Sequence, residues 1–198
     1  MKPIEECDPL FLRYFDRWYE ADDRQRKGVP ATRPDMIQGD VIIRTLPDDI
    51  GPLTAEGRQD VLKQIETMTQ AAKSDWARYL KVSGDLDLNW ISAIDQHYHR
   101  DRIRDVIKDS QPDDFSNNYL VTCCEFGAAM GYVLRSICPR LLWYPDWPYW
   151  ESALLDPQSN TLIPVFHWAV KKMSEYGVDD GFAEKIQVCI QMLNDRAK

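Results

Sequence analysis

The stretch from Trp143 to Trp168 constrains the fold more than any other part of this 198-residue chain. It holds four of the seven tryptophans, and the run Asp156–Asn160 inside it has the composition of a tight turn, with proline where its fixed backbone angle favours turning. Strands are expected on both sides of this turn, at about 149–155 and 161–163. The sequence therefore predicts one β-hairpin, at about 149–163, within a chain whose other patterns are helical.

A central helix is predicted at about 118–137, in the least charged part of the chain. Bulky residues from Phe126 to Ile137 recur at helical spacing on one face, and small residues around Gly127 and Gly131 form a second stripe. Because glycine costs about 1 kcal/mol in a helix relative to alanine, two of them indicate that a neighbouring backbone packs closely there. The predicted fold class is α+β, mainly α, with about six helices packed round this helix and the hairpin beside them.

Capping residues mark the other helices, because short polar side chains accept hydrogen bonds from first-turn amides. The first helix is expected to begin at Asp8 and to end before Gly28, and one continuous helix is expected to carry Ile91 to Val106. The expected N-caps are Asp8, Thr54, Asp87 or Asn89, and Asp179, and Gly177 is expected just past the end of the helix that begins at Pro164.

No clean linker divides the chain, so residues 1–198 are predicted to form a single domain. The segment 29–53 is rich in proline, aspartate and glycine and is predicted to be a long loop. Within it, residues 41–43 have the composition of a short strand.

The net charge of −8, from 24 basic and 32 acidic residues, argues against nucleic acid or an anionic membrane as the main partner, because both need a cationic surface. The first residues lack the apolar segment of a secretory signal. The run Ser116–Leu134 contains Glu125 and two glycines, which favours a buried helix of a soluble protein over a membrane span. A cytoplasmic protein is expected.

Five cysteines are present, and two of them, Cys123 and Cys124, are neighbours in the sequence. Their number is odd and their spacing is not that of a metal site, which is typical of reduced thiols in a cytosol. Neither a cofactor nor a metal ion is predicted.

The densest group of potential metal ligands is the run from Asp95 to Asp101, which includes His97 and His99. On one helix the two histidines would point in nearly opposite directions, although either could pair with an aspartate four residues away. Two ligands are too few for a zinc site. An exposed face with mixed charges is the favoured interpretation.

Arg100, Arg104 and Lys108 share one face of the same predicted helix and could hold a phosphate or a carboxylate. Asp101 and Asp105 lie between them, so pairing within the helix is favoured.

Glu125 is the one charged residue in the central apolar run. Burying a carboxylate is costly, so a buried one often serves a function. However, Thr122, Tyr132 and Ser136 share its predicted face, and Glu125 could instead reach a hydrogen bond or the solvent edge. Both interpretations remain open at the level of sequence.

His167 lies between Phe166 and Trp168 at the start of a predicted helix. A single histidine in such a place is usually a packing residue with one hydrogen bond. Cys123, Cys124 or Ser152 could supply a nucleophile to it, but the sequence has neither a nucleophile elbow nor an oxyanion loop. No catalytic residue is therefore assigned.

The aromatic segment offers the remaining candidate for binding, because tryptophan and tyrosine are enriched at binding hot spots. We expect Trp143 and Trp168 in the core. Trp147, Tyr149 and Trp150 are too crowded for every ring to face inward, so at least one is expected to be exposed or to line a groove.

The C-terminal part of the chain, at about 120–195, resembles several uncharacterised bacterial domain families that share an ordered pattern. Tyr132 departs from the acidic residue common at that position, and the run Trp147–Trp150 is an elaboration. The resemblance implies a small cytosolic accessory protein, of a kind sometimes encoded beside toxin or secretion genes, and assigns no catalytic residue. The matching residues are 126–131 (Gly-x3-Gly), Trp143, the turn 156–160, Pro164, Val165 and Phe166, Val170 to Lys172, Gly177, Asp179 and Asp180.

The function that these patterns favour is a non-enzymatic protein of accessory or immunity type that binds another protein, and the acidic charge favours a basic partner. The candidate binding residues are Trp147, Tyr149, Trp150, Glu125 and His167. The alternative is a small enzyme or ligand-binding protein whose pocket lies near Glu125 and His167. That alternative requires the two side chains to converge on one cavity.

Overall fold

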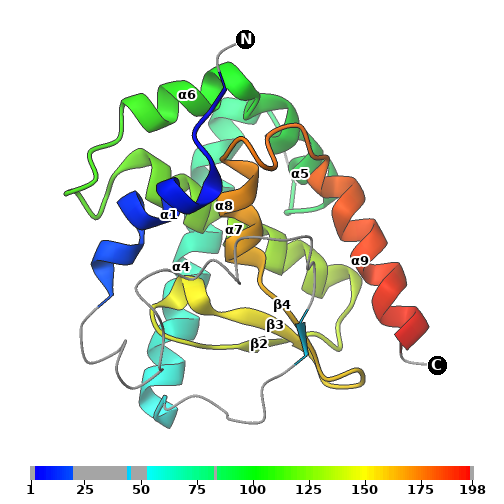
Figure 1. The fold of residues 1–198 in the computed structure, drawn as a ribbon. Helices are drawn as coiled ribbons and strands as arrows, with labels where there is room; N and C mark the ends of the chain where they lie inside the picture. The colour runs from blue at the N-terminus through cyan, green and yellow to red at the C-terminus, as the bar shows by residue number, and fades with distance from the viewer. Residues whose placement is uncertain (1–2, 20–43, 46–52, 83, 197–198) are drawn as a thin grey trace.

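The computed structural model describes residues 3–19, 44–45, 53–82 and 84–196. In this part of the chain, seven α-helices and one small antiparallel sheet form an α+β fold that is mainly α, as predicted. Figure 1 shows the helices stacked above and behind the sheet. The helices are α1 (Cys7–Tyr14), α4 (Ala55–Leu80), α5 (Leu88–His97), α6 (Arg100–Lys108), α7 (Asn118–Ile137), α8 (Val165–Lys172) and α9 (Phe182–Arg196), and two short 3₁₀ helices are η1 (Asp16–Trp18) and η2 (Tyr149–Glu151).

The predicted central helix is α7, which has the predicted bounds and is buried along most of its length. It packs mainly on α4 and α8. A Cβ atom on Gly127 would lie 2.8 Å from Cα of Phe166, and one on Gly131 would lie 2.4 Å from Cη2 of Trp143. The two glycines therefore allow the predicted close approach. Ile137, expected on the inward stripe, is 44% exposed because it lies in the last turn.

By length and composition alone, α7 could cross a membrane, but 72% of its most apolar stretch is buried inside the protein. That burial is typical of the core helix of a soluble protein. The five cysteines are all buried and free. Burial raises the pKa of Cys7, Cys124 and Cys189 to about 12, so these thiols stay protonated at neutral pH.

Helix α4 begins where its cap predicts, because the Thr54 hydroxyl accepts a hydrogen bond from the Gly57 amide at 3.1 Å. Its apolar stripe faces the core from Val61 to Trp76. Tyr79, at the end of that stripe, is 65% exposed. The stripe thus leaves the core one turn before the helix ends.

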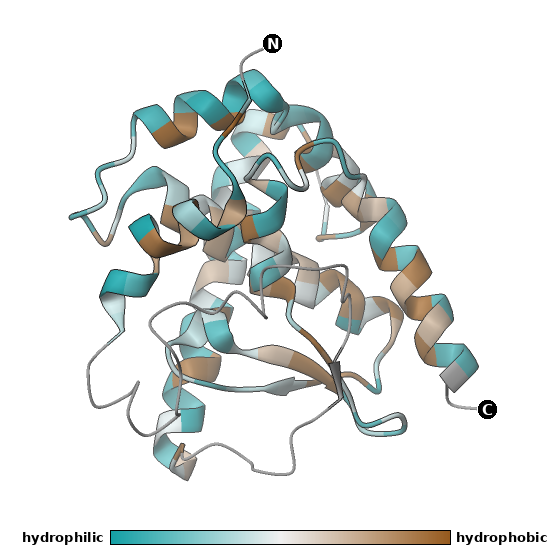
Figure 2. Cartoon of the chain, in the orientation of Figure 1, coloured by the Kyte–Doolittle hydropathy of each residue, from teal (hydrophilic) through white to brown (hydrophobic). Residues whose placement is uncertain are grey.

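The continuous helix predicted for residues 91–106 is wrong, because the chain breaks between α5 and α6. Tyr98 leaves the helical region, and His99 takes the extended backbone of an N-cap before α6. Figure 2 shows α6 with apolar residues on its inner side and polar residues outside, which agrees with the burial of Ile103 and Val106. The break lets two short amphipathic helices each bury a face in a different direction.

The sheet has the order β1-β4-β3-β2 and is antiparallel throughout. The predicted hairpin is formed by β3 (Ala153–Asp156) and β4 (Thr161–Ile163), whereas the first residues of its expected first strand, Tyr149–Glu151, form η2. Two strands were not predicted: β2 (Leu142–Tyr144) beside β3, and β1 (Arg44–Thr45) beside β4. β1 lies within the expected loop 29–53, while the strand suggested at 41–43 falls outside the described residues.

Two predicted helix starts differ in the structure. α1 begins at Cys7 after an N-cap at Glu6, so Asp8 lies within its first turn, and the helix ends at Tyr14. The expected end near Gly28 lies outside the described residues. At α9, the cap comes from another helix instead of Asp179, because the Asp95 carboxylate of α5 accepts hydrogen bonds from the backbone amides of Phe182 and Ala183.

The connection from α8 to α9 is organised by Lys172, whose buried ammonium donates to the carbonyls of Val178 and Asp180 and lies 3.2 Å from Asp95. α8 ends at Lys172, so Gly177 lies farther along the connection than predicted. A Cβ atom there would approach the Lys171 carbonyl oxygen to 2.7 Å. Gly177 therefore permits backbone packing instead of capping the helix.

Candidate functional site

The aromatic segment divides between core and surface. Trp168 is in the core as predicted, but Trp143 is only partly buried, with one edge of its ring packed against Gly131 of α7. Tyr149 and Trp150 are buried, Trp150 to 3% exposure, and Trp147 is partly exposed. The ring expected at the surface is therefore that of Trp147.

A groove with a volume of about 450 Å³ lies beside this segment. Trp18 and Phe115 form its second wall, with ring centroids 5.1 Å apart and the rings edge to face. Phe115 is 51% exposed although it is a large apolar residue. The remaining lining residues are Lys63, Gln64, Thr67 and Met68 of α4 and the run Trp147, Pro148, Tyr149 and Trp150.

His167 belongs to a buried polar cluster at the inner side of the aromatic segment. Its Nε2 lies 3.2 Å from Oε2 of Glu151, and the other carboxylate oxygen accepts a hydrogen bond from the Tyr19 hydroxyl. The Trp150 indole donates to the same hydroxyl at 3.2 Å. Nδ1 of His167 has no hydrogen-bond partner among the described residues. This cluster joins three segments of the core, and the ring of His167 also stacks on Phe11.

Glu125 lies elsewhere, at the floor of a polar pocket with a volume of about 260 Å³ between α4, α5, α6 and α7. The side chain is 6% exposed. Burial, together with the nearby negative charge of Asp75, raises its pKa to about 7, and the indole N–H of Trp76 lowers it in part. Among the described residues, that indole is the one side chain that donates a hydrogen bond to Glu125.

The floor of this pocket also includes Tyr98 and Thr122, both buried. Burial raises the pKa of Tyr98, so its hydroxyl stays protonated. The rings of Trp76 and Tyr98 are 6.1 Å apart. The outer part of the pocket is polar and more exposed, and it is formed by Asp75, Tyr79, His97, Arg102, Asp109, Asn118 and the partly buried Val121.

Glu125 and His167 do not converge. The pocket of Glu125 and the small cavity beside His167 have no lining residue in common. Tyr132, which shares the predicted helix face of Glu125, donates a hydrogen bond to Asp85 at 2.5 Å and lies beneath the Lys73 ammonium. The single cavity required by that alternative is not present in the described part of the protein.

The break after α5 also changes the environment of the histidines. His97 ends α5 and lines the Glu125 pocket, while His99 precedes α6. Burial and the charge of Arg102 lower the pKa of His97, so its imidazole is neutral at pH 7. In the residues that the structure describes, no group of three acidic, histidine or cysteine side chains is placed to hold a metal ion.

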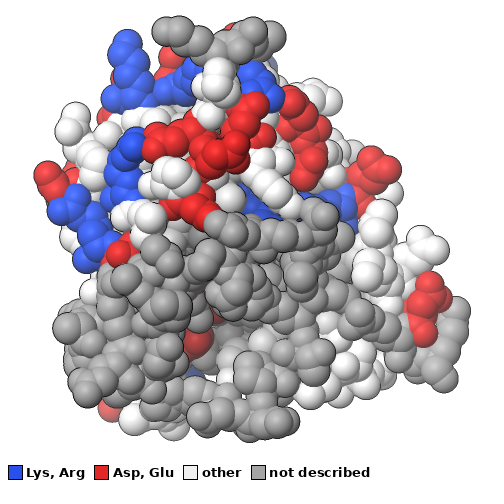
Figure 3. Space-filling view, in the orientation of Figure 1, with Lys and Arg blue, Asp and Glu red and all other residues white. Residues whose placement is uncertain are grey.

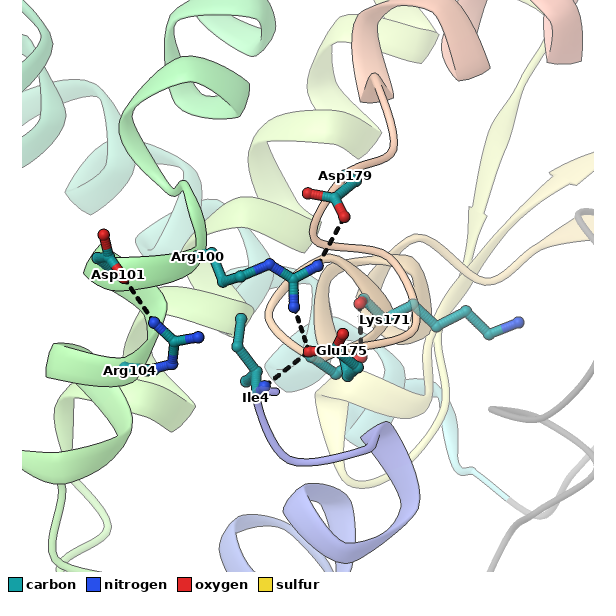
Figure 4. A network of polar contacts seen from close by, with 8 residues as sticks. Ile4, Arg100, Asp101, Arg104, Lys171, Glu175 and Asp179 are labelled. Carbon is teal, nitrogen blue, oxygen red and sulfur yellow. Dashed lines mark hydrogen bonds and ion pairs between the residues drawn. The ribbon is translucent and has the colours of Figure 1, made fainter. Parts of the chain in front are cut away.

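The arginines of α6 behave in two ways (Figure 4). Arg104 pairs within its helix with Asp101 at 2.5 Å, as favoured from the sequence. Arg100 instead reaches the connection between α8 and α9, where it pairs with Glu175 and, at 2.6 Å, with Asp179. Glu175 also accepts a hydrogen bond from the Ile4 amide at 2.6 Å. Arg100 is therefore occupied by carboxylates of the protein itself.

Sequence reasoning missed three contributors to these sites. Phe115 is an isolated aromatic residue in a turn region, outside the apolar stripe of any predicted helix or strand. That isolation could have been used to predict that its ring lies at the surface. Glu151 and Trp76 gave no such signal, because their partners come from distant segments. No family model, curated protein or solved structure matches this chain in the comparisons made.

Proposed function

We propose that this protein is a non-enzymatic accessory factor that binds a basic protein partner through the groove between Phe115 and Trp147. The observation that carries the proposal is the groove itself, about 450 Å³ in volume and lined by aromatic rings from three separate segments. Exposed apolar surface of this kind usually marks an interaction site, and aromatic anchors supply most of the binding energy there.

The partner that we infer presents an apolar or aromatic side chain to the groove, flanked by basic residues. The net charge of −8 favours association with a positively charged protein. Figure 3 shows carboxylates gathered on the upper middle of one face, over the N-terminal segment and the connection between α8 and α9. The apolar groove would anchor the partner, and the acidic surface would accelerate its approach.

A cytoplasmic location and an immunity-type or other accessory role belong to the same proposal. They are supported by the free, buried cysteines, which are typical of a reducing compartment, and by the resemblance of residues 120–195 to small bacterial accessory proteins. In this interpretation the protein acts by occupying a surface of its partner.

The test is selection of peptides from a phage-displayed library on the purified protein. We expect enriched peptides with an aromatic or large aliphatic residue beside lysine or arginine. Their binding should fall about thirty-fold or more in Phe115→Ala, because truncation of an aromatic anchor removes 2 kcal/mol or more. Tyr176→Ala, which removes an exposed ring outside both the groove and the Glu125 pocket, is the matched control and should bind like the native protein.

Trp150→Ala is not a suitable variant for this test, because the buried ring packs on Phe15 and Tyr149 and its loss would damage the core. Trp147→Ala is the second groove variant. The proposal is wrong if no peptide is enriched, or if Phe115→Ala and Trp147→Ala bind the selected peptides as tightly as the Tyr176→Ala control.

A further inference from the structure

The pocket of Glu125 lies apart from the aromatic groove and shares no lining residue with it. Four helices contribute to it, and its volume of about 260 Å³ has room for a small ligand. Its buried end combines a carboxyl group with the aromatic rings of Trp76 and Tyr98. Pockets with a few convergent polar groups on an aromatic lining are the usual form of small-ligand sites.

The charges around the pocket favour a cation. Asp75, Asp109 and Glu125 supply three carboxyl groups, and Arg102 supplies one guanidinium group. With His97 neutral, the ionised pocket therefore carries two excess negative charges. Aromatic faces add attraction, because a cation within about 6 Å of a ring centroid is stabilised by the ring quadrupole.

Glu125 itself has an unmet requirement. A buried carboxylate needs several hydrogen bonds or a counter-charge to remain ionised. The Trp76 indole provides one donor, and Asp75 opposes ionisation. A bound ammonium or guanidinium group would supply both the missing donors and the missing charge.

We propose that the pocket between α4, α5, α6 and α7 binds a small organic cation, with its ammonium or guanidinium group against Glu125 and its alkyl chain between Trp76 and Tyr79. Asp75 and Asp109 then face the outer part of the ligand, where a second amino group would lie. The ligand chemistry is shared by free amines and by lysine or arginine side chains.

Titration calorimetry with putrescine and agmatine tests the site directly, and the diol of the same length as putrescine is the neutral control. We expect saturable binding of the amines and no binding of the diol. Glu125→Gln should weaken binding about thirty-fold, because an ammonium group then faces a neutral amide in a desolvated pocket. Glutamine keeps the shape of the side chain, so this variant is expected to fold.

Arg102→Gln provides a test of opposite sign. Because Arg102 lies in the outer part of the pocket, removing its positive charge should tighten the binding of putrescine several-fold, whereas a purely structural residue would not improve affinity when replaced. Phe115→Ala should leave amine binding unchanged, since it alters only the groove of the proposed partner. Failure of this inference and failure of the proposed function are therefore separable.

The pH dependence follows from the ionisation of Glu125. The groups that face it are Asp75 and Trp76 of α4, Tyr98 and His97 at the end of α5, and Arg102 and Asp109 of α6. With a pKa of about 7 for Glu125, affinity for putrescine should rise about ten-fold in total from pH 6 to pH 8, as the ionised fraction of Glu125 rises from about a tenth to about nine tenths. Proton release on binding should be greatest on the acidic side of pH 7.

Short blocked peptides that contain one lysine or one arginine distinguish the two sources of the cation. Tighter binding of the free amines assigns the site to a small molecule, and tighter binding of the peptides assigns it to a basic side chain of another protein. The proposal is overturned if no cation binds saturably, if the diol binds as well as putrescine, or if Glu125→Gln leaves the affinity unchanged.

Discussion

The two buried glutamates, Glu125 and Glu151, lie in regions of opposite character. Glu151 is 4% exposed, and its carboxylate accepts a hydrogen bond from Tyr19 and lies 3.2 Å from Nε2 of His167. The folded protein itself therefore supplies partners for this carboxylate. Glu125 is buried to a similar degree but has a raised pKa, one side-chain donor and a cavity in front of it. The comparison teaches that burial alone does not distinguish a structural carboxylate from one that can receive a ligand, whereas the number of its partners does.

Glu151→Ala should have the largest effect on stability. It removes the acceptor of the Tyr19 hydroxyl and the partner of His167 Nε2 from a buried polar cluster. We expect the free energy of unfolding to fall by about 3 to 4 kcal/mol, measured by urea denaturation. Glu66→Ala, an exposed glutamate in the middle of α4, is the control. A loss no greater than that of the control would show that Glu151 is not a structural residue.

Glu125→Gln should stabilise the protein, but only at high pH. The pKa of Glu125 is about 7 in the folded protein, against an ordinary value of 4.5. Between these values the unfolded chain is ionised while the folded protein keeps the proton, so stability falls as the pH rises and the loss is complete above pH 7. The glutamine variant avoids this cost, which is about 3 to 4 kcal/mol for a shift of about 2.5 units at about 1.4 kcal/mol per unit.

Thermal and urea unfolding at pH 4 and pH 8 measure this difference. At pH 4 the native protein and Glu125→Gln should be equally stable to within about 0.5 kcal/mol, because Glu125 is protonated in the folded state and largely so in the unfolded chain. Glu66→Gln should show no such change with pH. Equal stability of Glu125→Gln and the native protein at pH 8 would remove the contrast between the two glutamates.

Tyr19→Phe should have a smaller effect, because it removes only the hydroxyl between Glu151 and the Trp150 indole. The variant thus loses two buried hydrogen bonds, and at about 1 kcal/mol each the expected cost is about 2 kcal/mol. Urea denaturation measures the cost, with Tyr79→Phe at an exposed position as the control. If the variant is as stable as the native protein, the hydroxyl is not part of what holds Glu151.

Asp75→Asn should have the smallest effect. The charge of Asp75 contributes less to the raised pKa of Glu125 than burial does, and exposed charges are screened by water and salt. We therefore expect the pKa of Glu125 to fall by a fraction of a unit, measured by NMR titration of its side-chain carbon. An unchanged pKa would attribute the whole shift to burial.

Local patterns predicted much of the fold. The bounds of α7 and the caps Thr54 and Asp87 follow from residues close in sequence, and so does the hairpin turn. The break between α5 and α6 and the strands β1 and β2 could not be predicted in the same way, because each depends on what the segment packs against. The glycine stripe indicated close packing but not that Phe166 and Trp143 would be the neighbours.

The candidate sites could also be predicted only as far as local sequence patterns allow. The sequence predicted that at least one of Trp147, Tyr149 and Trp150 is exposed, and it identified Glu125 as an unusual charge. The alternative function required Glu125 and His167 to share one cavity, and the structure separates them, because the side chains that surround each residue come from helices far apart in the chain. A site assembled from four helices has no local signature.

The cap that Asp95 provides to α9 has a consequence for the order of events during synthesis. The carboxylate and the amide that it accepts from, Phe182, are 87 residues apart, and the ammonium of Lys172 lies between them in sequence. Lys172 has its hydrogen-bond and ion-pair partners, Asp95, Val178 and Asp180, before α9 is made, whereas Asp95 has its full set only when the first turn of α9 has formed. A nascent chain that lacks α9 can therefore keep the ion pair of Asp95 with Lys172, while the carboxylate still lacks the two amides that it will cap.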